Sequence, residues 1–97
     1  MKYQVVIRPH ADDDIRKAYQ WYEERADGLG SEFLRAVVAA TERLERSPLT
    51  FKIERGKYRR LHLRKFPYAL HFEIAASEVS VLACLHFRQD PTRWPGG

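Results

Sequence analysis

The C-terminal half of the chain contains two runs in which apolar and polar side chains alternate, followed by a third that is mostly apolar. They read YRRLHLR (58–64), YALHFEIA (68–75) and EVSVLACLHF (78–87). Alternation with a period of two is typical of β-strands, whose successive side chains point to opposite faces of a sheet. The last run is apolar at both sets of positions, which is typical of a strand covered on both faces. We therefore expect three strands here.

The first two runs are joined by a short turn at Lys65-Phe66. A turn of this length favours a tight antiparallel hairpin. Matching the apolar faces of the two strands predicts Leu61 opposite Leu70 and His62 opposite Ala69.

The N-terminal half has a different pattern. Residues 2–8 are rich in β-forming side chains and predict a strand that Pro9 ends. From His10 onward the apolar residues follow helical spacing until the break at Gly28-Leu29-Gly30. A second helical pattern then begins, with Ser31 as its expected N-terminal cap.

The second helix should stop before Pro48, and residues 48–57 are expected to form a loop. Because few residues separate the two helices, they should lie antiparallel as a hairpin. The predicted fold is α+β: an N-terminal strand, an antiparallel helical hairpin and three antiparallel strands, with the helices packed on one sheet. We expect a single domain over residues 1–97.

Composition supports one small core and excludes several classes of protein. The 97 residues are 44% hydrophobic and 12% aromatic, which is enough apolar surface for one domain. A single cysteine excludes an intramolecular disulfide, and no Cys/His spacing predicts zinc. No segment reaches the roughly 20 apolar residues that span a bilayer, and the N-terminus lacks the apolar region of a signal peptide. We expect a cytoplasmic protein without cofactor, metal or membrane association.

Positive charge is concentrated in the second half of the chain. Residues 1–51 carry eight basic and nine acidic side chains, whereas residues 52–97 carry nine and four. Such a field favours an anionic partner, either nucleic acid or an acidic protein segment. The alternative is a solvated basic surface with no partner. We call the main cluster the basic run; it comprises Lys52, Arg55, Lys57, Arg59, Arg60, Arg64 and Lys65.

Three consecutive aspartates, Asp12, Asp13 and Asp14, open the first helix. Metal ligation is one interpretation, but consecutive residues on a helix point in different directions. Acidic side chains also complement the positive end of the helix dipole, and this is the interpretation we favour.

The polar side of the predicted hairpin is the main candidate site. Alternation places Arg60, His62 and Arg64 beside His71, and Arg88 follows the last strand closely enough to join them. Imidazoles and guanidiniums can supply the base, acid and phosphate-binding charges that RNA cleavage requires. The same side chains could instead line an exposed sheet face or a protein-binding groove. Similarly, Trp94 could stack on a base or close the core.

Taken together, these elements resemble the RelE/ParE superfamily of toxins from type II toxin–antitoxin systems. The resemblance covers nearly the whole chain and agrees with the predicted fold. It is carried by Ala11-Asp12-Asp13-Asp14-Ile15, Trp21-Tyr22, Gly28-Leu29-Gly30, Phe33, Leu44, Pro48, Arg59-Arg60, Phe66-Pro67-Tyr68 and the segment HFRQDPTRW (86–94).

Within the superfamily, RelE-like members cleave messenger RNA on the ribosome. Arg60 and His62 stand where those nucleases have two strand lysines, and Ala69 stands where they have an arginine. Arg64 retains a basic residue, Arg88 stands where the nucleases have their last-strand arginine, and Trp94 stands where they have a tail tyrosine. The incomplete set favours the ParE-like branch, which is associated with inhibition of DNA gyrase.

Two alternatives remain at this stage. One is a ribosome-dependent mRNA endonuclease, with His62 or His71 as base and with Arg60, Arg64 and Arg88 on the phosphate. The other is a basic binding module without toxicity.

The resemblance implies a cognate antitoxin that covers the basic sheet and the helical hairpin. DNA gyrase is the expected target, with the ribosome and mRNA in the alternative, and no small-molecule substrate is expected. The candidate residues for contact with antitoxin or target are Arg59, Arg60, Arg64, Arg88 and Trp94.

Overall fold

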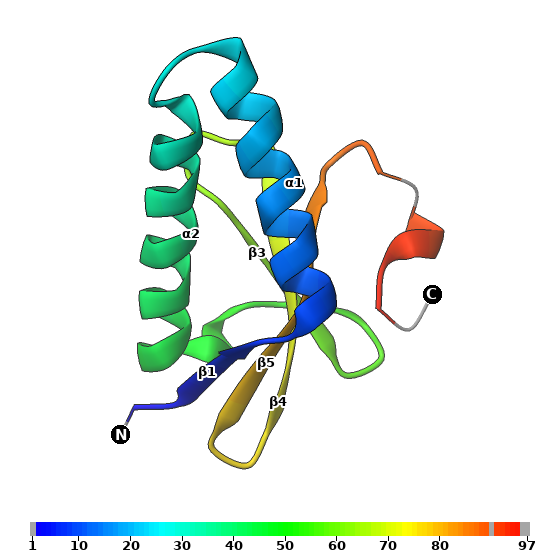
Figure 1. Ribbon diagram of the computed structural model, residues 1–97. Helices are drawn as coiled ribbons and strands as arrows, with labels where there is room; N and C mark the ends of the chain where they lie inside the picture. The colour runs from blue at the N-terminus through cyan, green and yellow to red at the C-terminus, as the bar shows by residue number, and fades with distance from the viewer. Residues whose placement is uncertain (1, 90, 96–97) are drawn as a thin grey trace.

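A short strand and two long helices form the N-terminal half of the chain in the computed structural model, which describes residues 2–89 and 91–95 (Figure 1). Strand β1 (Gln4–Ile7) leads directly into α1 (Pro9–Arg25), which is followed by α2 (Leu29–Arg46). Pro9 occupies the first turn of α1, where a missing N–H leaves no intrahelical hydrogen bond unmade. The two helices pack against each other, as predicted for the hairpin.

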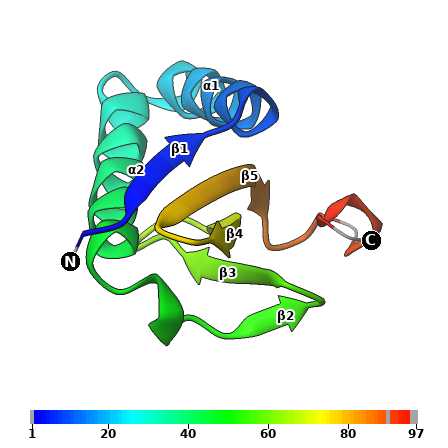
Figure 2. The same ribbon diagram turned by 90° about the horizontal axis from the view of Figure 1, so that it is seen from below.

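The strands form one five-stranded sheet in the order β1-β5-β4-β3-β2, and Figure 2 shows them following one another in this order. β1 pairs with β5 in parallel, whereas the other neighbouring pairs are antiparallel. The sheet is therefore mixed, because β1 runs parallel to its neighbour β5, whereas the three predicted strands are antiparallel to one another. The remaining elements are η1 (Pro48–Thr50), β2 (Ile53–Arg55), β3 (Tyr58–His62), β4 (Tyr68–Ala75), β5 (Glu78–His86) and η2 (Pro91–Arg93).

The predicted register of the central hairpin is confirmed. Leu61 faces Leu70, and His62 faces Ala69. Lys65 lies at the tip of the turn with a φ of 71°, a left-handed conformation that is uncommon for a residue with a side chain.

The expectation of a loop over residues 48–57 was wrong in part, because this segment contains η1 and β2. β2 pairs with β3 at the edge of the sheet. The guanidinium of Arg59 also donates to the carbonyl of Phe51 at 2.7 Å. An edge strand of three residues, two of them exposed, has no apolar alternation that the sequence could reveal.

The expected cap at Ser31 was also wrong. α2 begins at Leu29, after Gly28 with a φ of 86°. The Glu23 carboxylate accepts hydrogen bonds from the backbone N–H groups of Gly28 and Gly30, both at 2.9 Å. A side chain from α1 therefore satisfies the donors that an N-terminal cap usually serves.

The apolar core lies between the helical hairpin and one face of the sheet. Apolar residues of α2, β3 and β4 are buried there, among them Phe33, Leu61 and Phe72, whereas Leu34 and Val38 of α2 are exposed. At Gly30 the helices approach so closely that an added Cβ would lie 2.8 Å from the ring of Tyr19. The opposite face of the sheet carries polar side chains of β3 and β4, among them Arg60 and His71.

Candidate functional site

Neighbouring positions on β3 and β4 build the polar face of the sheet, defined here as Arg60, His62 and His71. Arg60 lies directly opposite His71 in the register of the two strands. The two histidines differ in exposure. The side chain of His71 is only 3% exposed, whereas that of His62 is exposed. The predicted proximity of these three residues is therefore confirmed, but the face is not an open surface.

The tail (residues 91–95) covers the polar face. The ring of Trp94 lies 5.3 Å from that of His71, and the Arg60 guanidinium carbon lies 4.5 Å from the Trp94 ring centre. Arg55 of β2 also contacts the tail, since its guanidinium donates to the carbonyl of Pro91 at 3.1 Å. Both views place η2 on the opposite side of the molecule from α2 (Figures 1 and 2). Trp94 thus stacks on the protein's own side chains instead of joining the core under the helices.

Burial and positive charge keep the imidazole of His71 neutral. Burial is the larger cause and the cation of Arg60 the second, and together they lower the pKa of His71 to about 4. The same two causes lower the pKa of the more exposed His62, whose ring lies 4.5 Å from that of Phe87. A lowered pKa favours the neutral form of each imidazole at neutral pH, which makes both poor general acids.

Arg60 is engaged within the protein. Its guanidinium forms an ion pair with Glu54 at 3.2 Å. Its Nε atom is covered and has no hydrogen-bond partner among the residues that the structure describes. A guanidinium held in this way is not free to receive a phosphate without displacing Glu54 or Trp94.

The other candidates lie apart from this group. β3 ends at His62, so the alternation that predicted Arg64 on the polar face stops too early. Arg64 instead lines a separate hollow with Arg35 of α2. The guanidinium of Arg59 donates to the carbonyl of Phe51. Arg88 is exposed, and its backbone N–H donates to His86 Nδ1 at 3.0 Å.

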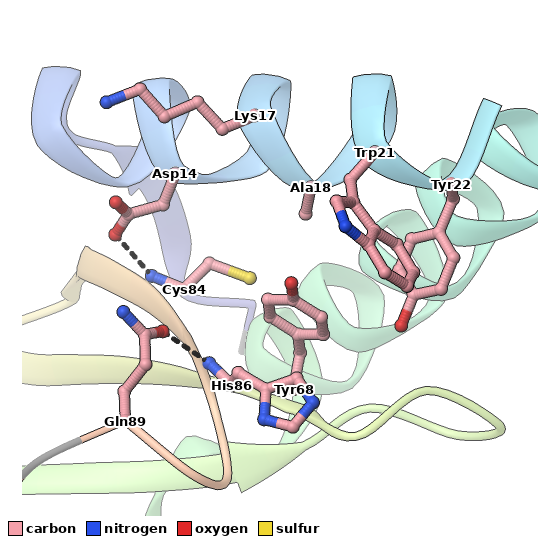
Figure 3. Close-up of a pocket in the computed structure, with 9 residues that line it drawn as sticks. All are labelled: Asp14, Lys17, Ala18, Trp21, Tyr22, Tyr68, Cys84, His86 and Gln89. Atoms are coloured by element: carbon pink, nitrogen blue, oxygen red, sulfur yellow. Dashed lines mark hydrogen bonds between the residues drawn. The ribbon is translucent and has the colours of Figure 1, made fainter. Parts of the chain in front are cut away.

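A second polar and aromatic region lies between α1 and the outer edge of β5 (Figure 3). We call it the groove; it has a volume of about 420 Å³. The residues that line it include Asp14, Trp21, Tyr22, Tyr68, His86 and Gln89.

Two side chains of the groove accept hydrogen bonds from the backbone of β5. The Asp14 carboxylate accepts a hydrogen bond from the N–H of Cys84 at 3.0 Å, and the amide oxygen of Gln89 accepts one from the N–H of His86 at 2.7 Å. Burial raises the pKa of Asp14 and raises that of the Cys84 thiol to about 12, so this cysteine is a buried, unreactive group.

The three aspartates of α1 have separate partners. Asp12 pairs with Arg16 at 3.0 Å and Asp13 with Lys17 at 2.9 Å, while Asp14 faces β5. Among the described residues, no cluster of His, Cys, Asp and Glu side chains has the form of a metal site. Neither helix in this part of the chain is long and apolar enough to cross a membrane.

Comparison with known proteins identifies the family. The sequence model of the ParE toxin of type II toxin–antitoxin systems, parDE, matches residues 5–91. The chain belongs to the ParE toxin family. It is thereby a member of the RelE/ParE superfamily, as the motifs predicted. No curated protein matched in a search by sequence.

A solved structure, described as a chromosomal ParDE TA system from P. aeruginosa, has the same fold. The alignment covers 88% of this chain and 96% of that chain, with a TM-score of 0.75 and 17% sequence identity. At this identity the likeness concerns the arrangement of helices and strands.

Several residues of these two regions carry no signal in the sequence that marks them as part of a site. Glu54 and Arg55 lie on the unpredicted strand β2, so their role in holding Arg60 and the tail was hidden. Trp21 could have been noticed, because it lies off the apolar stripe of α1 and is 49% exposed. The contact of Asp14 with β5 leaves no local signal, since 70 residues separate its partners.

Proposed function

We propose that this ParE-family chain is the toxin of a type II toxin–antitoxin pair that acts in the cytoplasm by binding DNA gyrase and inhibiting it. In this proposal the chain acts through a protein–protein interface and is not itself a catalyst. Family membership supports the toxin class, and the chemistry of the polar face favours binding over RNA cleavage.

The proposal rests mainly on one observation: Trp94 of the tail lies over His71 and Arg60 of the polar face. RNA cleavage requires a base and an acid with pKa values near the working pH, both within reach of the substrate. Here His71 lies beneath Trp94 with a pKa of about 4, and Arg60 is paired with Glu54. The nuclease alternative would require the tail to leave and this ion pair to break.

An antitoxin is the second protein in the proposal. The basic run lies on β2, β3 and the short segments that flank them. Arg60 pairs with Glu54 and Lys57 with Glu73, and the run has more basic than acidic side chains. An acidic segment that folds on binding would complement this charge. Arg59, Arg60, Arg64, Arg88 and Trp94 remain the proposed contacts for the antitoxin or the target.

The test uses one preparation of the purified chain in two reactions. We expect loss of supercoiling by gyrase, or accumulation of the cleaved gyrase–DNA complex, while mRNA on translating ribosomes stays intact. Normal supercoiling at high toxin concentration, together with codon-dependent mRNA cleavage, would overturn the proposal in favour of the endonuclease.

A pair of charge reversals makes this test specific. Arg88→Glu changes an exposed candidate at the end of β5, whereas Lys2→Glu changes an exposed lysine beside the turn between β4 and β5. Both substitutions alter the net charge equally. We expect Arg88→Glu to weaken inhibition and Lys2→Glu to leave it nearly unchanged. Equal effects would assign the role to net charge instead of to this position.

A further inference from the structure

The last two members of the basic run differ from the others in their contacts. On β2, β3 and the turn between them, Arg55, Lys57 and Arg60 are each held by another part of the chain. Arg64 and Lys65, in the turn after β3, are both exposed. Neither of these two side chains has an ion pair or a hydrogen bond in the part of the chain that the structure describes. The positive charge of this turn is therefore available to a ligand.

The turn that carries these two cations is anchored to the core. The ring of Phe66 contacts that of Tyr22 at 5.0 Å and that of Phe33 at 5.4 Å. The backbone N–H of Leu63 donates to the carbonyl of Tyr68 at 2.8 Å, and the N–H of Tyr68 donates to the carbonyl of Phe66 at the same distance. A turn ordered in this way loses little conformational freedom when it binds a ligand.

The backbone of the same turn is suited to an anion. Lys65 has a φ of 71°, and a left-handed residue within a turn is typical of concave sites in which successive N–H groups face an anion. The N–H groups of Arg64, Lys65 and Phe66 donate to no acceptor among the described residues. Strained conformations of this kind cluster at sites that bind ligands. The turn therefore offers backbone donors in addition to its two cations.

A third cation faces the turn from α2. Arg35 lines a hollow of about 240 Å³ together with Arg64 and Lys65, and Figure 1 shows this turn beside the first half of α2. Arg35 is exposed and also has no ion pair in the described chain. Among the described residues that line the hollow, Glu32 alone carries a carboxylate. Three cations therefore stand against one carboxylate, and an anion between them would relieve their mutual repulsion.

The donors of the hollow match the phosphodiester backbone of a nucleic acid. A guanidinium binds phosphate through two parallel hydrogen bonds, and an ammonium binds it as a point charge. Neighbouring phosphates follow one another at about 3.4 Å along the axis in each strand of a duplex, so cations from two adjoining elements can contact successive phosphates. Apart from Glu32, the lining side chains carry no acceptor for the N–H groups of a peptide or a base. Such a site recognises phosphate without reading a sequence.

We propose that this hollow, which we call the tip site and define by Arg35, Arg64 and Lys65, binds the phosphates of duplex DNA without sequence preference. Arg64 and Lys65 contact one phosphate together with the N–H groups of the turn. Arg35 contacts the next phosphate along the strand. The inference rests on the proposed function in one respect, because gyrase acts on duplex DNA and a toxin bound to it would lie beside that DNA.

The test measures binding of the full chain to a fluorescein-labelled DNA duplex of about 24 base pairs and mixed sequence, at salt concentrations from about 50 to about 200 mM. Three phosphate contacts predict that the logarithm of the affinity falls with the logarithm of the salt concentration with a slope of about −2.7. Single-stranded RNA of the same length has a lower charge density and should bind more weakly. Absence of saturable DNA binding at the lowest salt concentration, or equal or tighter binding of the RNA, would overturn the proposal.

Two double variants locate the bound DNA. Arg64→Gln combined with Lys65→Gln removes two charges of the tip site, and we expect about tenfold weaker binding and a salt slope smaller by about 1.8. The matched control, Lys2→Gln combined with Arg46→Gln, removes two exposed cations near the C-terminal end of α2. It changes the net charge equally and should leave the slope nearly unchanged. Equal losses in the two double variants would assign binding to net charge and overturn the tip site.

The supercoiling assay separates this inference from the proposed function. Inhibited gyrase with no binding of DNA by the toxin itself would overturn the tip site alone. DNA binding that depends on Arg64 and Lys65, with unaffected gyrase, would support the tip site and overturn the gyrase proposal.

Discussion

The polar face and the groove contain similar side chains in opposite states. On the polar face, Trp94 covers His71, and Arg60 is paired with Glu54. In the groove, the phenols of Tyr22 and Tyr68 face open space without a partner in the described chain. A covered cluster contributes to stability, whereas donors left unpaired at the surface are available to a ligand. The covered and the open region should therefore contribute differently to the free energy of unfolding.

The largest expected effect is a pH dependence that arises from His71. The pKa of this imidazole is about 4 in the folded chain, against an ordinary value of 6.5. Between these values the unfolded chain binds more protons, so the free energy of unfolding increases with pH. The stabilising contribution should be complete above about pH 6.5 and lost toward pH 4, for a total of about 3 kcal/mol.

Urea denaturation between pH 4 and 7.5 measures this slope. His71→Gln should remove most of it, while His10→Gln, at an exposed position, should retain it. An unchanged slope in His71→Gln would mean that other groups cause the pH dependence.

Removal of the covering indole should have the next largest effect. Trp94→Ala exposes the face of Arg60 and the ring of His71, with an expected loss of about 1–2 kcal/mol. NMR titration should show the pKa of His71 rising toward its ordinary value. Trp21→Ala, in the open groove, is the matched control and should cost less, since this indole is already 49% exposed. Equal losses would contradict the distinction between the covered and open regions.

A loss of similar size should follow from removal of the Asp14 carboxylate, which accepts a hydrogen bond from the backbone of β5. Asp14→Ala leaves the N–H of Cys84 without its acceptor, at an expected cost of about 1–2 kcal/mol. Asp14→Asn keeps an amide oxygen at the same place and should cost less. Thermal unfolding of both variants measures the difference, and equal losses would show that the hydrogen bond is not the cause.

The smallest effect is expected for the groove phenols. Tyr22→Phe and Tyr68→Phe remove no internal hydrogen bond, so each should change the free energy of unfolding by less than about 0.5 kcal/mol. Urea denaturation with Tyr58→Phe as reference tests this. A decrease of more than about 1 kcal/mol in the free energy of unfolding would show that the hydroxyl has a hydrogen-bond partner within the protein and is not available to a ligand.

Local patterns were sufficient for most of the fold. Alternation over residues 58–75 predicted the hairpin and its register, and helical spacing predicted α1 and α2. The prediction failed where a long-range contact replaced a local signal. Glu23 of α1 serves the start of α2 in place of Ser31, and β2 exists because it pairs with β3.

The candidate site was predictable only as far as the strands extend. Arg60, His62 and His71 came together because strand register is a local property. Arg64 and Arg88 follow the ends of their strands, where alternation no longer fixes the direction of a side chain.

The sequence alone determined the order of the elements, the pairing of β3 with β4 and the resemblance to a toxin superfamily, because these depend on periodicity and on motifs within short segments. Only the tertiary structure decided which polar groups are covered. Trp94 reaches His71, and Asp14 reaches Cys84, across long stretches of chain. Such contacts depend on how packed elements meet in space, and no local pattern of residues encodes them.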